Sequence, residues 1–153
     1  MSQLAFYNPS VVDSTPQAAL FQEHVQHTVQ GSKTYMYGRA DSNLSANAAV
    51  IFVGTSGSEG QVQNLTKARL VALNYGVAVA AVDVPSGSYG WFQIIGRSVV
   101  ASAAGTTATS AVYTAGSGDV GSTAGSETRI QGMSVQSIGA GVSNCYLSRP
   151  MRG

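Results

Sequence analysis

The chain has little charge of either sign. Only 10% of its 153 residues are Asp, Glu, Lys or Arg, against about 25% in an average globular domain. The formal net charge is +1, and the eight basic and seven acidic residues form no run of like sign. Because nucleic acids and anionic membranes are recognised by clustered positive charge, we expect neither as a partner.

Residues that bind metals or form disulfides are equally scarce. The chain has one cysteine, Cys145, which can form neither an intrachain disulfide nor a Cys-based zinc site. This predicts a reducing compartment and a structural thiol that behaves as a small buried hydrophobe. His24 and His27 stand three positions apart in a strand-like stretch, so they face opposite sides and cannot share one ion. We expect no metal and no cofactor.

Long apolar runs are missing as well. None approaches 18 residues, and the N-terminus lacks a basic stretch followed by an apolar one. The sequence therefore predicts a soluble, non-secreted chain, and its length predicts one domain.

Small and hydroxyl-bearing residues take the place of the missing charge. The chain contains 20 Ser, 11 Thr, 20 Ala and 18 Gly, a composition typical of all-β proteins rather than of charge-studded helical ones. Short β-branched and aromatic segments recur between Gly/Ser turns at roughly ten-residue spacing. We therefore predict a mainly β, single-domain barrel or sandwich over residues 21–153.

The pattern also predicts individual elements. Strands 25–30 and 33–39 would flank a Gly31-Ser32 turn, and Ala49 to Val53 would form a buried strand. One short helix is expected from Leu65 to Tyr75, with a capping box of Ser58 and Gln61 or with Asn64 as N-cap. Further strands are expected from Val77 onward, including one strand pair or one bent strand over 89–101, with Gly90 and Gly96 as bulge or bend sites.

Residues 1–20 differ from the rest of the chain. Pro9 and Pro16 disfavour a helix, so this segment reads either as an extended arm or as a frayed terminus. Apolar anchors favour an arm that docks on a neighbouring subunit or another surface. These anchors are Leu4, Phe6, Tyr7, Val11 and Val12.

A catalytic motif is not evident. Gly54, Ser56 and Ser58 do not fit the G-x-S-x-G spacing of a nucleophile turn. The glycine-rich loop 54–60 lacks the lysine of a phosphate cradle. We therefore expect that the chain is not an enzyme.

Three aromatic residues, Tyr89, Trp91 and Phe92, offer the remaining candidate site. Alternation puts Tyr89 and Trp91 on one face of a strand and Phe92 on the other. The rings could form a sugar-stacking platform, but Trp91 lies midway along the most apolar strand stretch. Burial in the core or in a subunit interface is therefore favoured.

Three segments together resemble a known family. YGWFQIIGRSVVASAAGTT, preceded by VAVAAVDV, is similar to a pattern in the small capsid decoration (cement) proteins of tailed bacteriophages. HTVQGSKTYMYGRADSNLSANAAV resembles their opening hairpin, with its V-x-G-x-x-x-Y-x-Y motif. The end of the chain, CYLSRP, resembles their closing strand. The resemblance covers residues 24–150.

The resemblance implies a noncatalytic, oligomeric β protein on the outer surface of a capsid, made in the host cytoplasm. Its partner would be the major capsid protein, and a homotrimer would match threefold junctions of the shell. We expect capsid or subunit contacts at Leu4, Phe6, Tyr7, Val11, Val12, Tyr89, Trp91 and Phe92. The alternatives are a carbohydrate- or host-binding β module on a virion surface and a small hydrolase with an unrecognised site.

Overall fold

The computed structural model describes residues 8–53, 60–73, 76–108, 111–123, 127–139 and 141–152. Of these residues 55% are in strands and 5% are helical, which confirms the mainly β prediction. The elements are β1 (Glu23–Thr28), β2 (Gly31–Ala40), β3 (Ala49–Val53), β4 (Gln61–Asn64), α1 (Lys67–Leu73), β5 (Val77–Ala80), β6 (Tyr89–Ala101), β7 (Val112–Thr114), β8 (Val120–Gly121), β9 (Arg129–Ile138) and β10 (Val142–Arg152).

Five of the strands close into a barrel. β2 pairs in parallel with β4, β4 with β3, β3 with β5 and β5 with β6, and β6 returns to pair with β2. The pairing therefore follows a ring, which leaves no free edge among these strands. Buried apolar side chains fill its centre and form the barrel core, which consists of Ala40, Leu44, Ala48, Val50, Phe52, Val62, Ala78, Ala80, Val84, Phe92 and Ile94.

Two loops of the same shape close one end of this barrel. Residues 41–48 connect β2 to β3, and residues 81–88 connect β5 to β6. The loops exchange backbone hydrogen bonds at their centres: Leu44 N donates to Val84 O (2.9 Å), and Val84 N donates to Leu44 O (2.8 Å). Each loop thus satisfies a backbone N–H and a backbone carbonyl of the other loop.

The strands beside these loops follow the same relationship. Adding 40 to the residue numbers at the end of β2 and in β3 gives positions in β5 and β6, and subtracting 40 leads back. Exchanging the two units in this way turns the pair Arg39–Tyr89 into the pair Val79–Ala49, and both pairs are observed. The barrel is therefore built from two strand-loop-strand units related by an approximate twofold axis.

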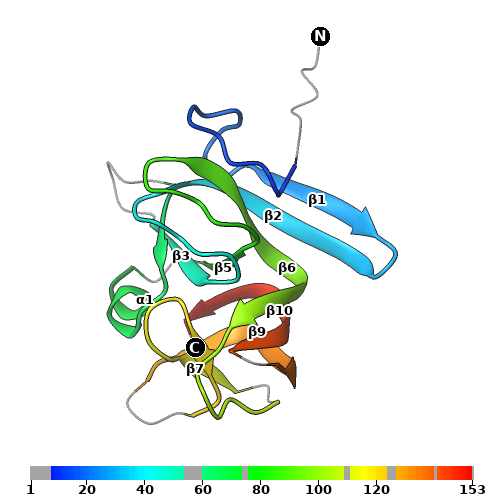
Figure 1. Cartoon of the computed structure of the whole chain (residues 1–153), viewed down its shortest axis with the longest axis vertical. Helices are drawn as coiled ribbons and strands as arrows, with labels where there is room; N and C mark the ends of the chain where they lie inside the picture. Colours follow the sequence, from blue (N-terminus) through cyan, green and yellow to red (C-terminus); the bar gives the residue numbers. More distant parts are fainter. Residues whose placement is uncertain are drawn as a thin grey trace.

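A second core lies outside the barrel. The outward-facing residues of β3 and β5, together with α1, pack against β7, β8, β9 and β10. Figure 1 shows this C-terminal sheet in the lower half of the molecule, with α1 at one side. The core residues are Ala49, Ile51, Leu65, Leu70, Val77, Val79, Val100, Val112, Val120, Ile130, Met133, Val135, Cys145 and Leu147.

β6 belongs to both halves and contains one bulge against β2, which lies at Ile94 rather than at Gly90 or Gly96. Thr34 pairs with Ile95 and Tyr35 with Gln93, so the residue between Gln93 and Ile95 is the extra one. The buried Gln93 amide holds this geometry, because Nε2 donates to the carbonyls of Ile95 (3.0 Å) and Arg97 (2.8 Å). Residues 89–101 thus form one bent strand, which was one of the two expectations, and not a strand pair.

The first hairpin turns two residues earlier than predicted. Thr28 pairs with Gly31, so the turn consists of Val29 and Gln30 rather than Gly31 and Ser32. Gly31 has a φ of 111° and begins β2 directly after the turn, where a side chain would be strained. The turn end of the hairpin formed by β1 and β2 extends away from the barrel (Figure 1).

The helix lies within the predicted range and is shorter. It begins at Lys67 because Thr66 is the N-cap, with Oγ1 accepting a hydrogen bond from Arg69 N (3.2 Å). The expected caps were wrong: Gln61 and Asn64 are the ends of β4, which pairs with both β2 and β3 and is therefore not helical. Ser58 lies outside the described residues.

Candidate interaction surface

The described part of the N-terminal segment lies on its own barrel. Asp13 forms a two-way bridge with Tyr89, with N–O distances of 2.9 and 2.8 Å. Val12 is partly buried against the barrel core, whereas Val11 is 44% exposed. The anchors Leu4, Phe6 and Tyr7 fall outside the described residues, and so does loop 54–59 with its serines.

A single tyrosine hydroxyl ties this segment to β2. Gln17 N donates to Tyr37 Oη (3.1 Å), and Tyr37 Oη donates to Asp13 Oδ2 (3.3 Å). Phe21 N and Tyr37 N complete the attachment through hydrogen bonds to Tyr37 O and Gln22 O. Burial raises the pKa of the Tyr37 phenol above its usual value, and the Asp13 carboxylate adds to this.

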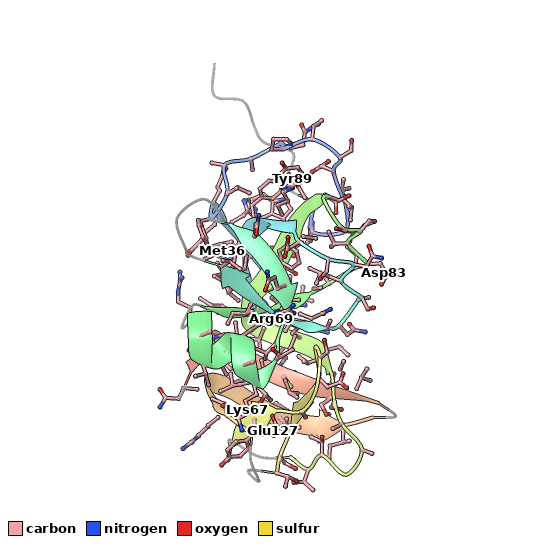
Figure 2. All side chains as sticks on the ribbon, turned by 90° about the vertical axis from the view of Figure 1, so that its left-hand side faces the viewer. Met36, Lys67, Arg69, Asp83, Tyr89 and Glu127 are labelled. Carbon is pink, nitrogen blue, oxygen red and sulfur yellow. The ribbon has the colours of Figure 1, made fainter. Side chains whose placement is uncertain are left out.

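Beneath the segment lies an aromatic layer formed by Tyr35, Tyr37, Tyr89 and Trp91. Tyr37 lies 4.9 Å from Trp91 and 6.1 Å from Tyr89, measured between ring centroids. His24 of β1 approaches Trp91 edge-on at 6.1 Å. Figure 2 shows Tyr89 at the end of the molecule that the N-terminal segment covers.

The strand alternation predicted for these rings is confirmed. Trp91 is 5% exposed in the aromatic layer, while Phe92 is fully buried on the opposite face, edge-on to Phe52 at 5.8 Å. The predicted burial of Trp91 is thus confirmed, and an open platform of Tyr89, Trp91 and Phe92 does not form. Phe92 belongs to the barrel core, so we remove it from the expected contact residues.

β1 forms one edge of the ten-stranded sheet, and within the described ranges it pairs only with β2. Val25 on β1 is 47% exposed, and Val29 at the turn is fully exposed. His24 pairs with Tyr35 and His27 pairs with Ser32, so the two histidines, three positions apart on β1, face opposite sides of the strand as expected. Among the described residues no His, Cys, Asp and Glu side chains cluster in a way that could hold a metal ion.

One ion pair connects β1 to the end of β10. Arg149 Nη1 and Nη2 donate to Glu23 Oε1 (2.7 Å) and Oε2 (2.6 Å). The hydrogen bonds from Arg149 hold the pKa of Glu23 below its usual value, and the same pairing raises the pKa of Arg149. Arg149 also lines an apolar cavity of about 200 Å³ that Met36, Phe52 and Ile94 help to form.

A larger groove opens between the first hairpin and the C-terminal sheet. Its volume is about 410 Å³, and two cationic side chains and several amides and hydroxyls line it. We call it the basic groove; its lining residues are Gln30, Lys33, Arg97, Ser98, Val99, Gln136, Ser137, Asn144 and Cys145.

Sequence reasoning missed this groove entirely. Lys33 and Arg97 are isolated cations, each in an unremarkable stretch of its own strand. They line the same groove because Gly96, the neighbour of Arg97 on β6, lies against Lys33: a Cβ on Gly96 would be 3.2 Å from Lys33 Cγ. Only the pairing of β2 with β6, which no local pattern reveals, brings them together.

α1 spans seven residues, and no helix in the described ranges is long and apolar enough to cross a membrane. No family model, curated protein or solved structure matches the chain.

Proposed function

We propose that the chain is a structural virion protein, a capsid decoration protein that binds the outer surface of a shell and ties neighbouring major capsid subunits together. One observation carries the proposal. The two motifs that resemble this family, Y-x-Y at Tyr35 to Tyr37 and the segment that begins at Tyr89, lie on adjacent strands. Tyr37 and Trp91 are cross-strand partners whose rings lie 4.9 Å apart. Residues that seem unrelated in the sequence therefore build one shared layer.

The surface agrees with a role in assembly. Val11, Val25 and Val29 leave apolar side chains exposed near the N-terminal segment and on the first hairpin. The edge strand β1 contains neither lysine nor proline, the residues that commonly block edge-to-edge pairing. Such an edge favours a closed oligomer, and a homotrimer fits a threefold junction of a shell.

Co-sedimentation tests the function. The purified full chain is mixed with expanded shells assembled from the major capsid protein of the same genome, and unexpanded shells serve as the control. We expect saturable binding to the expanded shells and a higher temperature of shell disruption, because ligation of many equivalent sites stabilises the bound form. A chain that stays in the supernatant at every shell concentration contradicts the proposal.

Sedimentation equilibrium of the free chain tests the oligomer. A homotrimer has three times the chain mass of 15.7 kDa. A monomer at every concentration, together with monomeric binding to shells, rules the trimer out.

A further inference from the structure

The basic groove carries an inference of its own, separate from shell binding. We propose that it is a binding site for an acidic saccharide, in which Lys33 and Arg97 hold a carboxylate or sulfate group and neighbouring amides hold sugar hydroxyls.

The charge in the groove identifies the anion. The side chains of Lys33 and Arg97 make no hydrogen bond or ion pair with the described residues, and no described acidic residue lines the groove. Arg149, further along β10, is already paired with Glu23. Two uncompensated cations in one groove favour an anionic ligand, and Arg binds planar oxyanions in two-point fashion.

The remaining lining indicates a saccharide. Gln30, Gln136 and Asn144 bring primary amides, and Ser98 and Ser137 bring hydroxyls. Each primary amide both donates and accepts, which suits the hydroxyl groups of a sugar. The groove volume of about 410 Å³ falls in the range of about 300 to 1,000 Å³ that small-ligand sites occupy.

An exposed aromatic ring, outside the groove lining itself, stands next to Arg97 on the neighbouring strand. Tyr146 is directly opposite Arg97 in the register of β10 and β6, so both side chains project from the same face of the sheet. Its ring is 47% exposed. A sugar whose acidic group rests on Arg97 can therefore place its C–H face against this ring.

An acidic peptide fits the groove less well. Protein interfaces depend on buried apolar and aromatic anchors, and the groove offers Val99 as its one open apolar side chain, since Cys145 is 1% exposed. Asn144 to Leu147 of β10 are paired with β6 on one side and with β9 on the other. A peptide therefore cannot extend the sheet along this part of β10.

Titration calorimetry with the full chain tests the site. The probes are oligogalacturonate (carboxylate only), a carrageenan oligosaccharide (sulfate only), a neutral galactan oligomer and poly-glutamate. We expect at least one acidic saccharide to bind and the neutral oligomer to bind at least about tenfold more weakly. The carboxylate and sulfate probes identify which anion is preferred. Rising salt should weaken binding, because both cations lie at the surface.

Matched variants assign the binding to the groove. Lys33→Ala with Arg97→Ala, and Tyr146→Ala alone, should each weaken binding about tenfold or more. Lys67→Ala with Arg129→Ala is the control: it removes the same charge from exposed residues outside the groove, with Lys67 on α1 (Figure 2), and should leave binding unchanged. Circular dichroism and urea unfolding verify that each variant is folded.

Three results overturn the proposal: no binding of either acidic saccharide, poly-glutamate binding as tight as theirs, or equal losses in the groove and control variants. Shell binding by the same variants separates this proposal from the proposed function. A variant that loses the saccharide but still decorates shells shows two independent surfaces.

Discussion

Asn43 and Asp83 make equivalent hydrogen bonds in the two interlocked loops. Asn43 Oδ1 accepts from Ser86 N (2.9 Å), and Asp83 Oδ1 accepts from Ala46 N (2.7 Å). Each side chain thus reaches across to the opposite loop and caps a backbone N–H group there. The two bonds clamp the end of the barrel from both sides of the approximate twofold axis.

Removing either clamp should destabilise the fold to a similar extent. Asn43→Ala and Asp83→Ala should each lower the free energy of unfolding by about 1 kcal/mol, because each leaves one backbone donor without its protein partner. Asp83→Asn keeps an acceptor oxygen and should cost less than about 0.5 kcal/mol. Urea unfolding measures these values. If Asp83→Asn cost as much as Asp83→Ala, the role assigned to the acceptor oxygen would be wrong.

Trp91→Ala should lower the free energy of unfolding more than Asn43→Ala or Asp83→Ala does. It removes the largest ring of the aromatic layer from a site that is 5% exposed, and buried aromatic residues cost about 3 to 5 kcal/mol on truncation to Ala. Tyr146→Ala is the control, since that ring is 47% exposed and should change stability by about 0.5 kcal/mol or less. Native Trp91 fluorescence should lie at the short wavelengths of a buried indole. Emission typical of a fully exposed indole contradicts this assignment.

The Glu23–Arg149 pair should make stability depend on pH. Since pairing lowers the pKa of Glu23 from its ordinary value of 4.5, its contribution is present above that value and is lost as the pH falls through the lower, folded-state pKa. Both side chains are substantially exposed, so the contribution at pH 7 is at most about 1 kcal/mol. Thermal unfolding of the chain and of Glu23→Gln at pH 7 and pH 3 measures it. The two proteins should differ at pH 7 and converge at pH 3; a constant difference contradicts the linkage.

Cys145 should be an inert thiol. Burial raises its pKa from 9.0 to about 11, which lowers the thiolate fraction at pH 8 by about 100-fold. Labelling with a disulfide reagent should therefore be slow in the native protein and fast in urea. Stability should fall as the pH rises from 9.0 through about 11, because the unfolded state then ionises first. Cys145→Ala should lose this alkaline dependence and still assemble; an intermolecular disulfide in the native oligomer contradicts the assignment.

Two truncations should separate the roles of the N-terminal segment. Deleting residues 2–7 removes Leu4, Phe6 and Tyr7 but leaves the Asp13–Tyr89 bridge in place. It should weaken oligomerisation or capsid binding with little effect on stability. Deleting residues 2–16 also removes Asp13, the partner of the Tyr37 hydroxyl. That deletion should leave the domain folded and should lower its unfolding temperature as well. If both truncated chains bind and assemble as the full chain does, the segment has no role in assembly.

Local patterns in the sequence were sufficient to predict much of the strand content. Ala49–Val53 is a continuous apolar run that a glycine follows, and such a run can be recognised without knowledge of its partners. The alternation of side chains likewise predicted that Trp91 and Phe92 face opposite sides, because successive residues of a strand do so in a barrel and in a sandwich alike.

The closed barrel and its twofold relationship could not be predicted in this way. Equivalent positions share a physical property and not a residue type: Asn47 and Gly87 both adopt positive φ (67° and 81°), and Asn43 and Asp83 both present an acceptor oxygen. A search for repeated letters does not detect such pairs. The ring also depends on the pairing of β2 with β6, which are far apart in the sequence. These contacts stabilise the fold only after the chain between the two strands has closed into a loop, so no local pattern predicts them.

The unbroken course of β6 has a mechanical consequence. The strand spans Tyr89–Ala101, with its first half held by β2 and its second half by β10. Tension applied along this direction, between the first hairpin and the C-terminal sheet, loads both hydrogen-bond ladders in shear. Many bonds must then fail together, whereas a hinge between separate halves would let them unzip in turn. In the proposed role on a shell under outward pressure, β6 would therefore transmit load between the two capsid subunits that the protein connects.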